Sequence, residues 1–483
     1  MYSYARQPLL KPMVFIIAII LIAGMVLPGG ISPAFGLTIN EEKEMGREFL
    51  KQARARYDFV DDPYVDHFIN TLGDTLVEAF PEQPFDFQFY VLKASEYNAF
   101  AAPAGYVFVN SGLIAAMNSE EELAGILGHE IAHVYCRHIS ERIEKSTAVS
   151  LATLAGVVAG VFLGGAGVVP GDAVAVGSLA AGQAVTLAYS RKDERQADQI
   201  GLKYLCDAGY SAEGLLAILK KMREKQWLTV QEMPTYLSTH PGTDERIAYI
   251  DTLLSTENFD QCRGNKKVAP GDFDILKTKI AAIYGNDDVA LRQFNARVEE
   301  STAGQGKMLA HYGYGLILSK KNRHQEALAQ FRAALDEAAL NPYILKALGK
   351  EYVLTGQYEK AMQILESVPE TGFYDPEKQY YLAQAAEGLG MAGKSIAILE
   401  EIIQQQPRSM PALHALGMTY GRQGNLKDAH YYLGLYHIQK RDRENALFHL
   451  NKALELTDDA DRREKIDNLL EELKGKKPSG KKP

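Results

Sequence analysis

Cysteine is scarce in this chain, and positive charge is not in excess. Only 3 of the 483 residues are cysteines, which excludes a disulfide-dense scaffold. Lys and Arg number 52 against 61 for Asp and Glu, so the net charge of −9 gives no electrostatic reason to bind nucleic acid. Apolar residues make up 46% and charged residues 23%, which excludes a polytopic membrane protein, a collagen-like fibre and a wholly disordered chain. The length indicates roughly two to four domains.

An unbroken apolar run stands near the N-terminus. Two basic residues precede residues 13–27, which are all apolar or small, and a Pro-Gly-Gly sequence would break any helix after them. A basic start, an apolar core of this length and small residues beyond it are typical of a secretory signal. We therefore predict a signal peptide over residues 1–36 and export from the cytoplasm. The alternative is an uncleaved anchor, for which the run is short of the about 20 residues that span a membrane.

Export would place the three cysteines in an oxidising compartment. One interpretation is a bridge between Cys206 and Cys262 that leaves Cys136 buried. The other is three inert buried thiols, and we favour this second interpretation.

Residues 118–143 are predicted to form a largely buried helix that carries two histidines. His129 and His133 are four residues apart, so they share a face and can bind one ion. Glu130 follows the first histidine, near enough to contact a water on the ion without binding the ion itself. This H-E-x-x-H pattern is typical of zinc peptidases, in which the glutamate is the general base.

Several neighbours of this motif are interpreted as structural. Ser119 and Glu122 predict a capping box at the start of the helix. Cys136 shares a face with His129 but would lie about 10 Å along the axis, so we expect a core thiol rather than a soft ligand. His138 would lie on the opposite side of the helix from His129, so we expect no part for it in the site.

A second capped helix is predicted to begin at Ser190, with Asp193 completing its capping signature. Glu194 and Asp198 are four residues apart and share a face of this helix. Glu194 can complete a site of two histidines and one glutamate. Asp198 can accept a hydrogen bond from the outer nitrogen of a ligating histidine, which fixes the tautomer of that ring. The alternative is a charged helix face in contact with solvent.

These two motifs together resemble the zinc peptidases related to the CAAX prenyl protease and the bacterial heat-shock membrane protease. The shared residues are His129-Glu130-x-x-His133 and Ser190-Arg191-x-x-Glu194-x-x-x-Asp198, and residues 95–112 are similar to the strand pair before the zinc helix of that family. The resemblance covers about residues 40–260. It implies a zincin-like endopeptidase domain with one zinc ion, Glu130 as the base and Glu194 as the third ligand.

The residues themselves also predict strands in this region. Residues 87–92 and 105–109 are rich in β-branched and aromatic side chains. A short sheet with an exposed edge beside the zinc helix would hold a substrate peptide as an added strand.

A loop near residue 240 is the third candidate part of the site. A Pro-Gly turn follows His240, and a helix capped by Thr243 is predicted after it. The resemblance implies that a loop histidine and a downstream arginine lie near the zinc. His240 could then fill the fourth zinc position and keep the site latent, or stabilise the oxyanion, and Arg246 could do the latter. The alternative is a turn histidine and a surface arginine.

Residues 148–188 are rich in glycine and almost free of charge. A single membrane crossing is excluded if His133 and Glu194, on either side, meet at one ion. We expect a mobile lid over the cleft that can touch a membrane peripherally. A membrane hairpin and a buried hairpin of small residues are the alternatives.

The C-terminal half shows a period of 34 residues. Gly356, Gly390 and Gly424 recur at this spacing, Asn322 lies one period earlier, and Arg441 comes half a period after the last glycine. This pattern predicts tetratricopeptide repeats, a helical solenoid with a groove for a protein partner. The alternative is packing of the array against the peptidase. Several tyrosines are candidates for the groove, although many of them must be core residues: Tyr343, Tyr352, Tyr358, Tyr380 and Tyr381.

The predicted fold class is α+β and predominantly α. After the signal peptide we expect a metallopeptidase domain over 37–265, a repeat array over 266–474 and a basic disordered tail over 475–483. This order resembles periplasmic quality-control proteases of Gram-negative bacteria. The resemblance implies a periplasmic enzyme whose partners are unfolded or misassembled proteins and the outer-membrane assembly machinery. The alternative function is a latent protease that acts mainly as a chaperone or scaffold.

Overall fold

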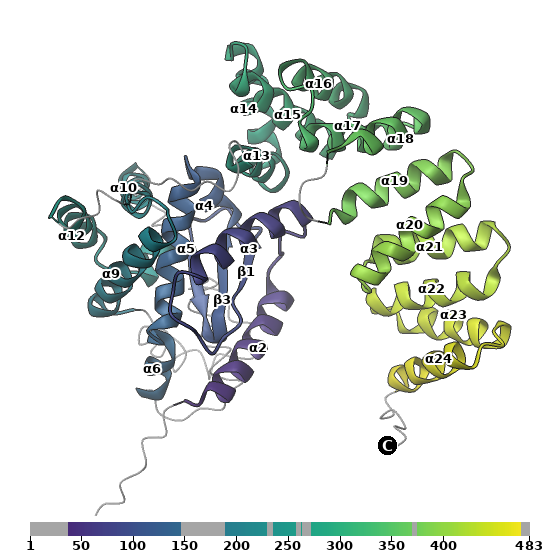
Figure 1. Ribbon diagram of the computed structural model, residues 1–483, viewed down its shortest axis with the longest axis horizontal. Helices are drawn as coiled ribbons and strands as arrows, with labels where there is room; N and C mark the ends of the chain where they lie inside the picture. Colours follow the sequence, from purple (N-terminus) through teal and green to yellow (C-terminus); the bar gives the residue numbers. More distant parts are fainter. Residues whose placement is uncertain are drawn as a thin grey trace, which may run out of the picture.

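The computed structural model describes residues 37–145, 189–228, 235–256, 262, 272–369 and 374–474. The predicted signal peptide, lid and tail lie outside these residues. Figure 1 shows a body around a small sheet and a curved array of helix pairs beyond it. The body consists of the described residues between 37 and 262, and we call it the catalytic body because it carries the residues predicted to be catalytic. Among the described helices, none is long and apolar enough to cross a membrane.

The sheet of the catalytic body has three strands. These are β1 (Gln88–Leu92), β2 (Ala99–Ala102) and β3 (Tyr106–Asn110), in the order β1-β3-β2. β1 runs parallel to β3, and β2 runs antiparallel to it. The two strands expected from their residue types are confirmed as β1 and β3. The alanine-rich edge strand β2 lies within residues 95–112, where the resemblance implied a strand pair. Stacked rings of Phe100 and Phe108, 4.9 Å apart, fix this register in the core.

Four helical elements pack around the sheet. They are α2 (Ile39–Arg56), α3 (Pro63–Val77), the turn η1 (Pro103–Gly105) and α4 (Ser111–Ala116). α2 carries the capping box of Thr38 and Glu41, and Asp62 caps α3. Both helices bury one apolar face in the same core as the sheet.

The helix with the two histidines, α5 (Glu120–Tyr135), is shorter than expected. It ends at Tyr135, and Arg137 turns the chain with a φ of +55° before α6 (His138–Lys145) begins. The predicted capping box is also wrong. Ser119 makes no side-chain capping bond with any described residue, while Glu122 accepts hydrogen bonds from the backbone N–H of Asn118 at 3.0 Å and from Nζ of Lys221 at 2.7 Å.

α9 (Arg191–Asp207) packs directly against α5, and a pair of glycines sets their separation. A Cβ on Gly201 would lie 3.0 Å from the carbonyl oxygen of Gly128 and 3.2 Å from Cα of His129. The predicted capping box of Ser190 and Asp193 is present at the start of α9. Close backbone contact therefore brings the two candidate ligand helices together.

Three helices follow α9 and complete the catalytic body: α10 (Glu213–Leu228), α11 (Thr235–Thr239) and α12 (Thr243–Thr256). Thr243 is the first residue of α12 rather than the cap before it. Cys206 and Cys262 form a disulfide with their Cα atoms 5.1 Å apart, so the favoured interpretation of three inert thiols is wrong. Cys136 is a half-buried thiol, and burial raises its pKa to about 11.

The array consists of antiparallel helices joined by tight turns. Gly356, Gly390 and Gly424 have φ values of +72°, +75° and +76°, and Asn322 has the same left-handed conformation at +59°. The 34-residue pattern is thus confirmed as one repeated turn, which favours glycine because the left-handed region is costly for other residues. The elements are α13 (Asp272–Lys279), the π-helical turn η4 (Ile280–Tyr284), α14 (Asp287–Glu300), α15 (Gln305–Lys320), α16 (His324–Glu337), α17 (Pro342–Leu354), α18 (Tyr358–Ser367), α19 (Pro376–Gly388), α20 (Ala392–Gln405), α21 (Met410–Arg422), α22 (Leu426–Gln439), α23 (Arg443–Leu456) and α24 (Ala460–Leu473).

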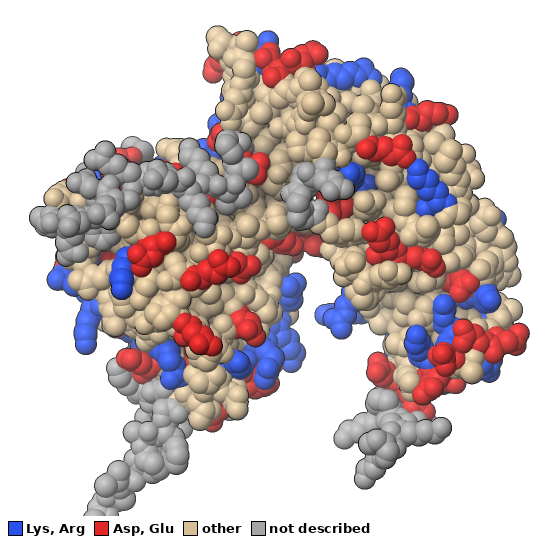
Figure 2. All heavy atoms as spheres, viewed as in Figure 1, with Lys and Arg blue, Asp and Glu red and all other residues tan. Residues whose placement is uncertain are grey.

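The start of the array packs against α3 of the catalytic body. The rings of Tyr64 and Tyr343 are 4.4 Å apart, and Nζ of Lys279 lies 2.5 Å from Oδ2 of Asp62. Tyr343, a candidate for the groove, therefore contacts the peptidase domain instead. Figure 2 shows a deep indentation between the catalytic body and the helices at the far end of the array.

Candidate metal centre

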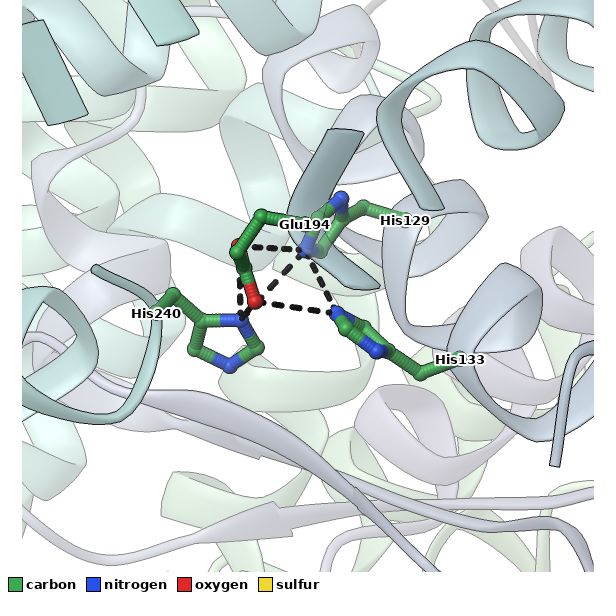
Figure 3. A group of neighbouring side chains, drawn as sticks. All are labelled: His129, His133, Glu194 and His240. Carbon is green, nitrogen blue, oxygen red and sulfur yellow. Dashed lines mark hydrogen bonds and ion pairs between the residues drawn. The ribbon is translucent and has the colours of Figure 1, made fainter. Parts of the chain in front are cut away.

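Four side chains from three segments converge beneath the sheet. His129 and His133 come from α5, Glu194 from the first turn of α9, and His240 from the turn after α11 (Figure 3). All four are at most 1% exposed. Nε2 of His129 lies 3.0 Å from Nε2 of His133, 3.5 Å from Oε2 of Glu194 and 3.4 Å from Nδ1 of His240. Oε1 of Glu194 lies 3.4 Å from Nε2 of His133 and 3.1 Å from Nδ1 of His240.

These distances fit a tetrahedral metal site. Ligand atoms about 2.0–2.1 Å from a central ion stand about 3.3 Å from one another at the corners of a tetrahedron. The five distances above, which involve both carboxylate oxygens of Glu194, range from 3.0 to 3.5 Å, and one ligand atom from each of the four residues lies within 4.8 Å of the others. Three imidazoles and one carboxylate are also donors that suit a borderline-soft divalent ion. The four side chains could therefore hold one metal ion with little rearrangement.

Two carboxylates and one arginine surround the first histidine. Oδ1 of Asp198 lies 2.9 Å from Nδ1 of His129, which is the contact expected from the spacing on α9. The guanidinium of Arg246 contacts Asp198 at 2.7 Å and Glu194 at 2.7 Å, so it balances two buried negative charges. Although burial opposes ionisation, His240 and Arg246 hold the pKa of Glu194 well below its usual range.

His138 contacts His133, the second histidine of the motif. The sequence did not predict this contact. Nδ1 of His138 lies 2.9 Å from Nδ1 of His133, and its Nε2 lies 3.3 Å from the side-chain oxygen of Gln196. A continuous helix would place His138 on the far side of the axis. The break at Arg137, which has a left-handed backbone, turns it back toward the site. An arginine gives no sequence signal of such a turn.

Two tyrosines pack on the ligand rings and were also missed. Tyr189 stacks on His133 with ring centres 3.6 Å apart, and Tyr236 stacks on His240 at 4.2 Å. Both tyrosines are at most 2% exposed, so they limit the movement of the two rings and keep water away from them.

Glu130 lies on the inner side of the cluster. Both of its carboxylate oxygens are buried without a hydrogen-bond partner among the described residues, and Oε1 is 3.6 Å from Nε2 of His240. Burial raises the pKa of this carboxyl group. A buried, unsatisfied carboxyl group is costly to maintain, and such groups are concentrated at sites where they take part in chemistry.

Comparison with known proteins agrees with this geometry. Residues 64–254 match the family model of peptidase family M48, and residues 318–387 match a model of the tetratricopeptide repeat. Residues 64–254 are therefore similar to an M48 peptidase domain. M48 peptidases use a metal, and the buried cluster provides ligands for one.

Curated relatives that match large parts of this chain include proteases. The chain is 27% identical over 439 residues to the β-barrel assembly-enhancing protease of Yersinia pestis, covering 83% of this chain and 89% of that protein. It is 27% identical over 300 residues to the β-barrel assembly-enhancing protease of Escherichia coli (strain K12), covering 62% of this chain and 60% of that protein. Among solved structures, that of the type IV pilus biogenesis factor PilW aligns at 16% identity with a TM-score of 0.33, covering 43% of this chain and 94% of PilW.

Proposed function

We propose that this chain is a zinc-dependent endopeptidase of the bacterial periplasm that acts in quality control or assembly of outer-membrane proteins. The observation that carries the catalytic part is the buried tetrahedral cluster with Glu130 beside it. The names of the Yersinia pestis and Escherichia coli relatives support the biological part. We further propose domain boundaries at 37–265 for the peptidase and 266–474 for the array.

In this proposal His129, His133 and Glu194 hold the zinc and Glu130 moves the proton. When bound, zinc lowers the pKa of a water toward about 7 and polarises the carbonyl of the scissile peptide. Glu130 accepts the proton of the attacking water at its carboxylate and later delivers it to the leaving amine nitrogen. The raised pKa of Glu130 suits it to hold that proton between the two steps.

His240 is proposed to be a latch on this site. Catalytic zinc sites keep one position open for water, whereas here Nδ1 of His240 stands at the fourth corner. The same ring also lies between the cluster and Glu130. His240 must therefore turn away before a water can reach both Glu130 and the metal. The alternative role of His240 is to stabilise the oxyanion, and this role requires that the ring has first turned away from the metal position.

Arg246 is proposed to position the ligands. Its guanidinium already contacts the carboxylates of Glu194 and Asp198, so binding an oxyanion would leave two buried charges unpaired. These contacts favour a positioning role over the oxyanion role that the sequence allowed.

A glutamine in place of Glu130 tests the catalytic proposal. Glu130→Gln keeps the shape of the side chain but cannot take a proton, so we expect casein cleavage to fall by about 10²–10⁴-fold. Zinc content, measured by elemental analysis, should stay unchanged. Equal cleavage by the variant and the wild type would contradict the proposal, and substrate proteins trapped by the inactive variant would name its natural targets.

An alanine in place of His240 tests the latch. Removal of the fourth ligand should open a water position, so we expect higher basal cleavage of casein by His240→Ala at unchanged zinc content. His311→Ala is a matched control, because His311 lies in the array and bonds to Gln330. Unchanged cleavage with unchanged zinc content would refute the latch.

The repeats are proposed to recruit unfolded or misassembled proteins, or the outer-membrane assembly machinery. The indentation beside the far end of the array is open to a protein partner on the face seen in Figure 2. A latent protease that acts mainly as a chaperone or scaffold is the second candidate, and the position of His240 favours it. The two differ in one measurement, because a scaffold would bind zinc but cut no protein even as the His240→Ala variant.

A further inference from the structure

The two histidines of the H-E-x-x-H motif meet different partners at their outer nitrogens. Nδ1 of His129 faces Oδ1 of Asp198 at 2.9 Å. Nδ1 of His133 faces Nδ1 of His138, also at 2.9 Å. The first ligand therefore has a carboxylate on its outer nitrogen, whereas the second has another imidazole there.

The direction of the hydrogen bond between the two imidazoles follows from the position of the cluster. Nε2 of His133 faces the cluster (Figure 3), 3.0 Å from Nε2 of His129 and 3.4 Å from Oε1 of Glu194, so this nitrogen offers its lone pair to a bound ion. A neutral imidazole carries one N–H, and in His133 that hydrogen must then be on Nδ1. Nδ1 of His133 therefore donates, and Nδ1 of His138 accepts.

Gln196 on α9 holds His138 in the tautomer that accepts. Because Nδ1 of His138 uses its lone pair, the hydrogen of the neutral ring is on Nε2. That nitrogen lies 3.3 Å from the side-chain oxygen of Gln196. An amide oxygen only accepts, so its position favours this tautomer.

A break between α5 and α6 places the ring of His138. Arg137 has a φ of +55°, a region that is costly for a residue with a Cβ. Its guanidinium donates to the buried carboxylate of Glu42 at 2.8 and 3.0 Å and to the carbonyl oxygen of Leu37 at 2.6 Å. These three bonds hold the turn despite its cost. His138 follows as the first residue of α6 and is 3% exposed.

We propose that His138 is a positioning residue of the metal centre, which accepts the outer N–H of His133 and so fixes the tautomer and the orientation of that ligand. This inference rests on the proposed zinc site and extends it to a residue outside the motif. The acceptor is a neutral ring, so it holds His133 without adding negative charge to a cluster that already contains Glu194 and contacts Asp198. Groups that hold the outer nitrogen of a ligating histidine contribute about 10–100-fold to metal affinity.

The zinc affinity of two variants tests the role of His138. The zinc dissociation constant of the full chain is measured by competition with a chelator. Leucine fills much of the space of the ring but offers no acceptor, so His138→Leu should raise the dissociation constant by about 10–100-fold. The amide oxygen of asparagine can stand where Nδ1 of histidine stands, so His138→Asn should bind zinc nearly as tightly as the wild type. His414→Leu is the matched control, because His414 lies in the array against Tyr436 and should leave the affinity unchanged.

Two results would overturn the proposal. One is an unchanged dissociation constant in His138→Leu. The other is an equal loss of affinity in His138→Asn and His138→Leu at equal unfolding temperatures, which would show that the shape of the ring matters rather than its acceptor nitrogen.

The hydrogens of the zinc-loaded wild type decide the question if His138→Leu does not fold. Nitrogen-15 NMR of the histidine-labelled chain should show a hydrogen on Nδ1 of His133 and on Nε2 of His138. A hydrogen on Nδ1 of His138 would contradict the proposal. Neither measurement depends on whether the chain cleaves proteins, so a failure of the proposed endopeptidase activity is distinguished from a failure of this role.

Discussion

The metal centre and the end of the array both gather histidines on neighbouring helices, but they do so from different stretches of chain. In the metal centre, His129 contacts His240 although the two residues are 111 positions apart in the sequence. In the array, His430 and His449 are only 19 residues apart and partly exposed. The first cluster therefore depends on long-range packing and on balanced buried charge, whereas the second follows from one helical hairpin. Changes in the two regions should differ accordingly.

The largest difference concerns buried and exposed ion pairs. Arg246→Ala leaves Glu194 and Asp198 buried without their partner, so we expect a loss of about 3–5 kcal/mol in the free energy of unfolding. Arg422→Ala is the control, because it removes an exposed pair with Glu387 and should cost at most about 1 kcal/mol. Unfolding in urea, followed by far-ultraviolet circular dichroism of the helices, measures both variants. Similar small losses in both variants would break the comparison.

A smaller difference is expected for two helical glycines. Gly201→Ala pushes α9 away from α5, because the added Cβ would meet the backbone of Gly128 at 3.0 Å, and should cost about 1–3 kcal/mol. It should also weaken zinc binding, since the ligands of the two helices move apart. Gly421→Ala in the array brings its Cβ no nearer than 3.7 Å to another atom and should be neutral or stabilising by up to about 1 kcal/mol. Thermal unfolding and zinc titration of both variants measure this.

Substitutions in the turns of the array should change the stability of the chain without changing the metal centre. Gly356 has a φ of +72°, so Gly356→Ala should cost about 1 kcal/mol through backbone strain. Because the turn is far from the metal centre in sequence and contacts, cleavage of a short peptide should be unchanged. Gly393→Ala, inside α20 and in open space, should instead stabilise the chain slightly. A loss of peptidase activity in Gly356→Ala would show that the two regions are coupled more tightly than their contacts indicate.

The last difference is a pH dependence at the junction of the two regions. Burial and the charges of Asp61 and Asp62 raise the pKa of Asp66 to about 7, against about 3.9 in an unfolded chain. Between these values the folded chain holds a proton that the unfolded chain releases, so stability falls as the pH rises from about 4 to about 7. Asp66→Asn should therefore raise the unfolding temperature more at pH 8 than at pH 5. An equal change at both pH values would contradict this.

The spacing of residues within each of two helices, α5 and α9, indicated most of the residues of the metal centre. His129, His133, Glu194 and Asp198 each depend on a four-residue separation, and the contact of Asp198 with His129 follows from it. The array was equally accessible, because one turn conformation recurs every 34 residues. Local rules of this kind are readable in a single sequence.

What the sequence did not predict depends on breaks and long-range contacts. His138 reaches His133 only because Arg137 turns the chain. The contact of Tyr64 with Tyr343 joins segments that no periodicity relates. The disulfide between Cys206 and Cys262 likewise required the positions of α9 and the segment after α12.

The disulfide also turns part of the chain into a closed loop. Cys262 lies between α12 and the array, and its bond to Cys206 joins it directly to α9. The 56-residue separation between the two cysteines encloses α10, α11 and α12. His240 and Arg246 both lie inside this loop. The proposed latch therefore stands on a covalently closed segment, and the closure reduces the number of conformations open to that segment in the unfolded chain.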